Sequence, residues 1–194
     1  LEFMGYAISN DEPWAAKCLF LTGEGNNGKS TFVNTIKSLV GAGSYSTIKV
    51  DNLANQQVLA GIEGKLFNLS EEGPQQLYKS GAFKNAVTGG EETVKRLYVQ
   101  PYQIYIRAKM IVTCNELPKS SDTTRGFFRR FLIVPFDRIF SAKDEDPFIA
   151  KKLNAELPGI LNRALTKYDQ LLKNKAFTFS EKSNASQKEF MESN

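Results

Sequence analysis

Histidine is absent from the 194-residue chain, and cysteine occurs only twice. Without histidine, Ser-His-Asp triads, histidine general bases and nearly all zinc sites are excluded. No apolar run approaches the roughly eighteen residues that a membrane-spanning helix needs, so no membrane partner is expected. Any chemistry must therefore use carboxylates, lysine, arginine, hydroxyl groups and backbone amides.

The two cysteines, Cys18 and Cys114, both lie within apolar runs. Buried free thiols in a reducing cytoplasm are favoured over a structural disulfide. The first residues lack the basic and apolar regions of a signal peptide, and a cytoplasmic location is expected. Hydrophobic residues make up 41% and charged residues 24% of the chain, which is typical of a globular domain with a core.

The formal net charge of +4 is concentrated in one part of the chain. Between Lys95 and Arg138 there are nine basic and three acidic residues, a local charge of +6, so the rest of the chain carries −2. A basic segment of this kind suits a polyanionic partner, either a nucleotide or a nucleic acid. A solvated charged face accounts for the charge alone equally well.

Short apolar segments that alternate with helical patterns predict an α/β fold, with a core sheet flanked by helices. Core strands are expected over residues 17–21, 65–70, 108–114 and 131–136. Helices are expected over residues 29–40, from an N-cap at Asp51 to about residue 60, over 75–87, and over 146–173 with a break at Pro158 and Gly159. Residues 93–106 alternate as a β-hairpin that turns near Pro101 and is inserted between the strands.

This pattern divides the chain into four parts. Residues 1–16 are expected to be a linker or the end of a preceding element, and residues 17–140 the ATPase core introduced below. Residues 141–175 are expected to form a C-terminal helical extension. Residues 176–194 are polar and are expected to form a tail to which no structure is assigned.

Residues 23–30 (GEGNNGKS) match the phosphate-loop pattern G-x-x-x-x-G-K-[ST] at every fixed position. The glycines let backbone amides turn towards phosphate oxygens, Lys29 brings positive charge to the β- and γ-phosphates, and the Ser30 hydroxyl ligates Mg²⁺. An apolar strand precedes the loop, and the N-terminus of the helix that follows favours the same anion. The sequence therefore predicts a nucleoside triphosphate site formed by Gly23, Glu24, Gly25, Asn26, Asn27, Gly28, Lys29, Ser30 and Thr31.

Polar residues also flank the other predicted strands. Glu71 and Glu72 end the strand 65–70; Glu71 is assigned to the metal and Glu72 to activation of the attacking water, with the order open to reversal. Asn115 ends the next strand and is a candidate γ-phosphate sensor, although asparagine is also a common turn residue before proline. Arg129 and Arg130 precede the last strand and are candidates for stabilising the transition state, in their own site or in a neighbour's.

The order of these segments resembles the superfamily 3 helicases, in particular the helicase domain of phage and plasmid primase–helicases. The matching segments are GEGNNGKS, LFNLSEE, TGGEETVKRLYVQPYQI, IVTCNELP and FFRRFLIVPF, between Cys18 and Phe136. The resemblance implies an AAA+-like ATPase core, a hexameric ring, ATP and Mg²⁺ as cofactors, and ATP-driven movement along single-stranded DNA. It also implies that Asn115 is the sensor and that Arg130, rather than Arg129, is the arginine finger reaching the adjacent subunit.

The same resemblance implies that the hairpin points into the ring channel and contacts DNA. The lysine expected within it is replaced by Leu97, so Lys95 and Arg96 are both candidates for the contact, with Tyr98 and Tyr102 suited to stacking on bases. An upstream primase or polymerase domain in the same chain is implied as well. Because related proteins carry a ring-closing region before the core, the 194-residue segment is expected to be mostly monomeric at low concentration.

Two other functions fit the phosphate loop. A small P-loop kinase would use the basic segment 119–130 as a lid over a phosphoacceptor, whereas a GTPase is disfavoured because no Asn-Lys-x-Asp segment is present. A nucleotide-switched module that loads or holds DNA without translocating would have nearly the same sequence. Strand displacement that follows ATP turnover distinguishes the helicase from this module.

Overall fold

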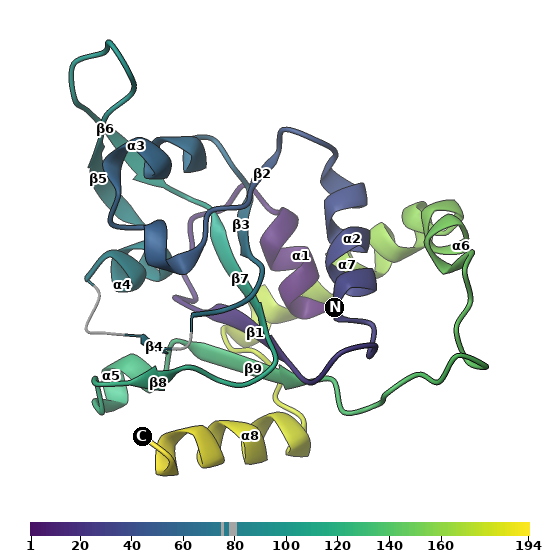
Figure 1. Ribbon diagram of the computed structural model, residues 1–194. Helices are drawn as coiled ribbons and strands as arrows, with labels where there is room; N and C mark the ends of the chain where they lie inside the picture. The colour runs from purple at the N-terminus through teal and green to yellow at the C-terminus, as the bar shows by residue number, and fades with distance from the viewer. Residues whose placement is uncertain (75, 78–80) are drawn as a thin grey trace.

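A five-stranded sheet forms the centre of the molecule, and helices cover both of its faces (Figure 1). The computed structural model describes residues 1–74, 76–77 and 81–194. The strands are β1 Cys18–Thr22, β2 Tyr45–Ser46, β3 Phe67–Ser70, β4 Gln76–Leu77, β5 Gly90–Val94, β6 Tyr102–Ile106, β7 Lys109–Cys114, β8 Lys119–Ser120 and β9 Phe131–Pro135. The helices are α1 Glu2–Ile8, α2 Lys29–Val40, α3 Gln56–Leu59, α4 Gly81–Thr88, α5 Arg125–Phe128, α6 Ile149–Ala155, α7 Leu157–Asn174 and α8 Glu181–Glu192, with short 3₁₀ turns η1 Val50–Asn52 and η2 Ala60–Ile62.

The strand order in the central sheet is β2-β3-β7-β1-β9, and every neighbouring pair is parallel. In the register, Leu19 of β1 lies opposite Ile111 of β7 and Leu132 of β9. Helices on both faces bury both sides of these strands, which explains their nearly continuous apolar sequences. The four predicted core strands are thus confirmed. Two-residue strands such as β2 carry no periodic signal, and none was expected there.

Two hydrophobic clusters lie on the two faces of the sheet. Alternate residues of β1 belong to different clusters, with Leu19 and Leu21 in one, and Cys18 and Phe20 in the other. The first cluster packs against α1, α2 and α7, and the second against α3, α4, α5 and α8. Cys18 and Cys114 are buried free thiols, as expected. Among the described residues, no helix has both the length and the apolar character that crossing a membrane requires.

The first residues form a helix where the sequence analysis expected a linker or the end of an element. α1 packs along α7 and buries Phe3, Met4, Tyr6 and Ala7. At Gly5 the two helices come so close that a Cβ would stand 2.3 Å from the Ala164 carbonyl oxygen, so only glycine fits. The helix is stabilised by this tertiary contact, which local periodicity does not reveal.

The polar C-terminal residues also form a helix, so the expectation of an unstructured tail was wrong. α8 lies against β9, where the Phe190 ring packs on Phe128 and Phe131 with centroids 5.3 and 4.9 Å apart. The Ser180 hydroxyl accepts a hydrogen bond from the Ser183 amide at 3.1 Å and caps the helix. One deeply buried aromatic residue and a cap thus anchor a segment whose mean hydropathy is low.

Three helix boundaries differ from the sequence prediction. Asn55, not Asp51, caps α3, because its side chain accepts hydrogen bonds from the amides of Gln57 and Val58. The helix predicted over residues 75–87 is seen as α4 from Gly81, and residues 75 and 78–80 lie outside the described part. The predicted break in the C-terminal helical segment is present, but at Glu156, between α6 and α7; Pro158 itself lies in the first turn of α7, where proline has no amide bond to lose.

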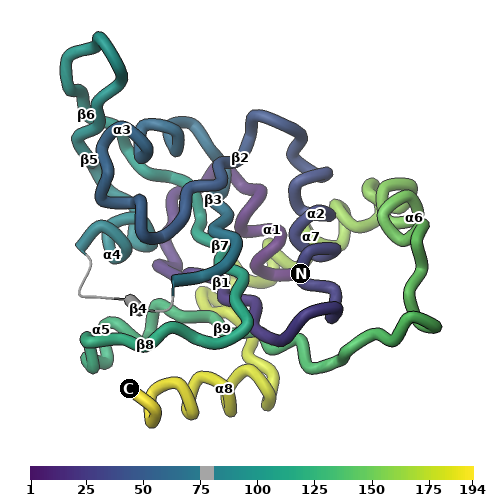
Figure 2. The backbone as a smooth tube through the Cα atoms, viewed as in Figure 1, coloured from purple at the N-terminus to yellow at the C-terminus, as the bar shows by residue number. Residues whose placement is uncertain are grey.

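The predicted hairpin is confirmed, although its first strand starts three residues earlier, at Gly90. β5 and β6 are antiparallel, with Val94 opposite Tyr102. Buried Val94, Ile104 and Ile106 join the base of the hairpin to the second cluster. The loop of residues 95–101 projects from the body of the molecule (Figures 1 and 2).

Lys109, at the start of β7, is buried almost completely, with 1% of its surface exposed. Its Nζ donates hydrogen bonds to the carbonyl oxygens of Ser9 (2.7 Å) and Asp11 (2.5 Å), and lies 5.4 Å from the centre of the Tyr6 ring. Burial lowers the pKa of Lys109 to about 8, an effect that Asp11 partly opposes. This lysine therefore ties the end of α1 to the central sheet.

The lowered pKa predicts how stability depends on pH. Below pH 8 Lys109 is charged in both states, so the native state carries the full cost of burying the charge. Between pH 8 and about 10.4 only the unfolded state holds the proton, so Lys109 contributes increasing stability as pH rises, up to about 3 kcal/mol. The measurement is the free energy of unfolding in urea, for wild type and Lys109→Met, between pH 7.5 and 9.5. Thiols and tyrosines also titrate at high pH, but they are the same in both proteins, so the difference between the two profiles reports Lys109. Parallel pH profiles would contradict the assignment.

Candidate functional site

The phosphate-loop residues connect the end of β1 to the start of α2. Asn26 (φ 57°) and Gly28 (φ 91°) adopt left-handed conformations, and Gly28 is the N-cap of α2. A Cβ at Gly25 would meet no atom within 4 Å, so the loop has open space beside it. The first turn of α2 begins directly after this loop, which is the arrangement of an anion-binding helix N-terminus. The loop geometry fits the phosphate cradle that the sequence predicts.

Lys29, in the first turn of α2, folds back over the loop. Its Nζ donates to the Gly23 carbonyl oxygen, to the Glu24 carbonyl oxygen at 2.9 Å and to Asn27 Oδ1 at 3.2 Å. Burial lowers the pKa of Lys29, and the neighbouring Cys114 opposes this effect. The ammonium group is thus held at the loop, while Ser30 is exposed and Thr31 half-buried.

The acid pair after β3 points in two directions. Glu71 Oε1 lies 3.0 Å from the Lys37 Nζ on α2, so this carboxylate is paired along the outside of the helix. Glu72 adopts a left-handed conformation (φ 55°) and lines a cavity together with Lys29. Its carboxylate is 3.8 Å from Lys49 and almost fully exposed. The sharp turn at Glu72 separates the surroundings of two adjacent acids.

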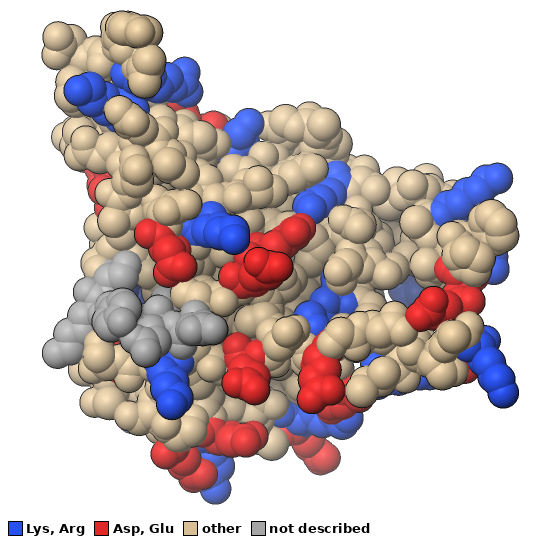
Figure 3. Space-filling model, viewed as in Figure 1, with Lys and Arg blue, Asp and Glu red and all other residues tan. Residues whose placement is uncertain are grey.

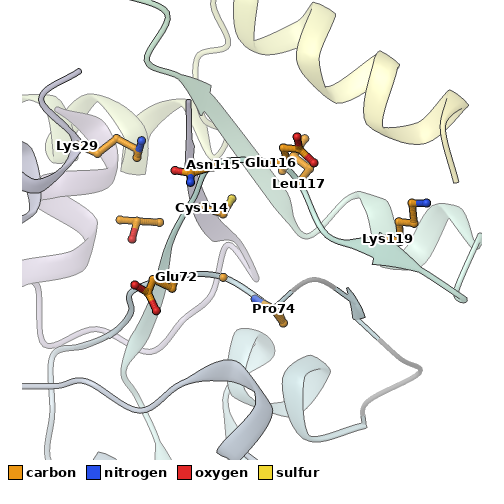
Figure 4. A pocket seen from close by; sticks show the side chains of 10 residues that line it. Lys29, Glu72, Pro74, Cys114, Asn115, Glu116, Leu117 and Lys119 are labelled. Carbon is orange, nitrogen blue, oxygen red and sulfur yellow. The ribbon is translucent and has the colours of Figure 1, made fainter. Parts of the chain in front are cut away.

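One cavity of about 630 Å³ joins the ends of β3 and β7 to the phosphate loop (Figure 4). Lys29, Glu72 and Asn115 all line it, and Asn115 follows the last residue of β7. The Gly23 amide donates to the Asn115 carbonyl oxygen at 3.3 Å, which fixes the start of the loop to the end of β7. Lys29 at the start of α2, Glu72 after β3 and Asn115 after β7 are therefore brought together, at the side of the sheet where the parallel strands end.

Arg129 and Arg130 lie at the other end of the strands, where β1 and β9 begin. The Cys18 amide, at the start of β1, donates to the Arg130 carbonyl oxygen at 2.7 Å, whereas the phosphate loop follows the end of β1. About 15 Å of strand separates the two places. The structure does not bring either arginine to the cavity of its own chain.

Arg130 is held in a compact turn at that edge. Its Nη1 donates to the Gly126 carbonyl oxygen, and its Nε is buried with no partner among the described residues. Burial lowers the pKa of Arg130, and the neighbouring Arg129 adds to the effect. Arg129 itself is exposed, and Lys17 donates to its carbonyl oxygen.

Asp122 fixes the segment that leads into this turn. Its carboxylate accepts from Lys84 Nζ at 2.6 Å and from the hydroxyl and amide of Thr124 at 2.6 and 3.0 Å. These bonds hold the pKa of the buried Asp122 carboxyl well below its usual range. Thr124 in turn caps α5, so Asp122 positions the short helix that directly precedes the arginine pair.

The candidate nucleic-acid residues lie on the projecting hairpin, where Figure 3 shows basic side chains. Tyr98, with 99% of its surface exposed and φ 60°, stands at the tip, and Lys95 is also exposed. Arg96 is paired with Glu63 at 2.8 Å, and the Tyr102 hydroxyl donates to the same carboxylate at 2.9 Å. Lys95 and Tyr98 are therefore more available to a ligand than Arg96 and Tyr102.

Several residues of the site were missed by the sequence analysis. Gly73 must approach β7 closely: its amide donates to the Thr113 carbonyl oxygen at 2.7 Å, and a Cβ there would stand 2.9 Å from Val112. Cys114 lines the cavity, and burial raises the pKa of its thiol to about 11. The position of Cys114 at the end of a predicted strand, directly before Asn115, is the sequence feature that could have placed it at the cavity.

Buried Asn68, in the middle of β3, was also missed as a structural residue. Its Oδ1 accepts from the Ser46 hydroxyl (2.7 Å) and the Ile48 amide (2.8 Å), and its Nδ2 donates to the Ile48 carbonyl oxygen (2.9 Å). Every polar atom of the amide thus has a partner, and the chain after β2 is fixed to the strand that ends in the acid pair.

A mainly parallel sheet flanked by helices, with a glycine-rich loop at the end of β1, defines a mixed α/β domain. Residues 21–130 match the model of a family of unknown function, DUF5906. The chain therefore belongs to the DUF5906 family.

Known proteins with similar sequence or structure are longer. The helicase candidate 121R of Invertebrate iridescent virus 3 is 24% identical in an alignment 168 residues long, which covers 79% of this chain and 18% of the viral protein. Two apo structures of the NrS-1 C-terminal region have the same fold, with TM-scores of 0.70 and 0.69 at 17% identity. They match 99% and 97% of this chain, which spans 46% of each.

Proposed function

We propose that this chain is the ATPase domain of a DNA helicase that acts as a ring in replication, with an AAA+-like core of the superfamily 3 type. The observation that carries the proposal is the meeting of Lys29, Glu72 and Asn115 around one cavity beside the phosphate loop. A cation, a carboxylate and an amide, contributed by three neighbouring parallel segments, are the groups that phosphoryl transfer requires. The name of the viral relative supports the helicase assignment.

The phosphate loop would hold the triphosphate of ATP. Amides of residues 25–31 and the Lys29 ammonium would contact phosphate oxygens, because the glycines leave the loop open to a ligand. Mg²⁺ fits the donor set present, since the Ser30 hydroxyl and the nearby carboxylates of Glu71 and Glu72 are hard oxygen ligands. When bound, Mg²⁺ neutralises charge on the phosphates.

Glu72 is better suited than Glu71 to activating the attacking water. Glu72 lines the cavity together with Lys29 and has only a long 3.8 Å contact with Lys49, whereas the Glu71 carboxylate lies 3.0 Å from Lys37. Glu71 would then reach the metal only by exchanging this ion pair for it. Asn115 would orient the water or contact the γ-phosphate from the end of β7.

Arg130 would act on the site of an adjacent subunit. It lies at the edge of the sheet away from its own phosphate loop, so a role in catalysis requires a second copy of the chain. The bonds around Asp122 and Thr124 would keep the arginine turn rigid for such a contact. A hexameric ring satisfies this requirement for every subunit, and Arg129 is the second candidate.

The hairpin would contact single-stranded DNA. Lys95 and Tyr98 are exposed on a loop that projects from the body, and together offer a cation for phosphates and a ring for bases. A longer protein with an upstream primase or polymerase domain and a cytoplasmic location is part of the proposal.

Replacement of Glu72 tests the catalytic assignment. Glu72→Gln removes the proton acceptor but keeps the shape of the side chain, so ATP hydrolysis is expected to fall by about a hundredfold or more, with ATP affinity maintained. Glu71→Gln is the comparison variant: because Glu71 is the candidate metal ligand, its replacement is expected to weaken binding of MgATP, an effect that Glu72→Gln does not share. Steady-state hydrolysis and equilibrium binding measure both effects. Normal turnover in Glu72→Gln would move the water-activating role to Glu71.

Mixing of two inactive variants tests the contribution in trans. Lys29→Ala and Arg130→Ala are each expected to lack ATPase activity, one through the loop and the other through the finger. Mixed together, they form interfaces that pair an intact loop with an intact finger, so activity is expected to return in part. A mixture that stays inactive at every ratio, while both variants still assemble, would refute the trans finger.

A further inference from the structure

The sheet order gives the phosphate loop two different flanks. β7 and β3 lie on one side of β1 and bring Asn115 and Glu72 to the cavity. β9 lies on the other side of β1, and the chain that leaves β9 runs past the loop towards α6 (Figure 1). We call residues 136–145 the flanking segment.

The flanking segment is bonded to the phosphate loop at several points. Asn27 Nδ2 donates to the Phe136 carbonyl oxygen at 2.9 Å. The Phe140 amide donates to the Asn26 carbonyl oxygen at 2.9 Å, and Asn26 Nδ2 donates to the Phe140 carbonyl oxygen and to Glu145 Oε1, both at 2.6 Å. The main chain of Phe140 thus holds this residue beside the loop, and these hydrogen bonds do not involve its side chain.

The ring of Phe140 lies directly alongside the loop. Its Cε2 is 3.7 Å from the position a Cβ would take at Gly28, and the residue is partly exposed. The guanidinium of Arg138 lies over this ring, 4.8 Å from its centre. A planar cation stacked on a partly exposed aromatic ring offers a surface on which a flat heterocycle stacks.

We propose that the Phe140–Arg138 pair forms the subsite for the nucleotide's base. The inference rests on the proposed function: if the γ-phosphate end of a triphosphate faces Glu72 and Asn115, the nucleoside end leaves the loop on the opposite flank. That flank is where the flanking segment places Phe140 against Gly28. Stacking recognises the flat face that all bases share, so the subsite adds affinity for a nucleoside without reading its hydrogen-bonding edge.

Comparison of a nucleotide with a ligand that has no base tests this subsite. Calorimetric titrations use MgATP and inorganic tripolyphosphate with Mg²⁺, on wild type, Phe140→Ala and Ile139→Ala. Loss of the ring is expected to weaken MgATP binding about tenfold and to leave the Kd of tripolyphosphate unchanged. Ile139, the adjacent residue with 61% of its surface exposed, is the matched control and is expected to change neither.

A second readout uses Phe140→Trp, in which a larger ring occupies the same place. Its fluorescence is expected to change on addition of MgATP and not on addition of tripolyphosphate, with Trp14 of wild type as the background. This variant keeps the stacking surface and therefore does not depend on Phe140→Ala being well folded.

The outcomes separate the subsite from the proposed function. Unchanged MgATP affinity in Phe140→Ala would overturn the subsite while the nucleotide site stands. An equal loss for both ligands would also overturn it, because the ring would then only support the loop. Wild type that binds neither ligand would refute the proposed function, and the subsite with it.

Discussion

The parallel alignment of β1 with β7 and β9 is the constraint on which the rest of the molecule depends. It places the ends of β1, β3 and β7 at one edge, where the phosphate loop, Glu72 and Asn115 meet. None of these residues is close to another in the sequence. The tight turns at Gly28 and Glu72, both in left-handed conformations, then direct the chain around the cavity. The candidate site is therefore a product of sheet topology combined with a few tight turns.

The same alignment separates the arginine pair from this edge. Because β9 runs parallel to β1, the residues that precede it must lie at the far end of the sheet. The arginine pair and the cavity therefore lie at opposite ends of the strands within one chain, and the proposed contact in trans would need a neighbouring copy to join them. The bonds of Asp122 to Lys84 and Thr124 hold the segment that leads to the arginine pair.

The core strands, α2, the hairpin and the phosphate loop could be predicted from the sequence, since each carries a local signal: an apolar run, a helical period, alternation or a glycine motif. α1 and α8 could not, because their stability comes from contacts such as Gly5 with α7 and Phe190 with β9, made across most of the chain. The different surroundings of Glu71 and Glu72 depend on Lys37 and on one backbone turn, which composition does not encode. The bonds from Asn26 to residues more than a hundred positions away were equally hidden.

The central claim is that two subunits together form the ATPase site and that ATP hydrolysis at this site is coupled to DNA. Its most direct test is ATP hydrolysis per chain, measured over a wide range of protein concentration with and without single-stranded DNA, with Lys29→Ala as the blank. The account predicts that turnover per chain rises with concentration, as subunits supply Arg130 to each other, and rises again when DNA is added. Turnover per chain that is constant at all concentrations and indifferent to DNA would contradict it and favour a kinase or a nucleotide-driven switch.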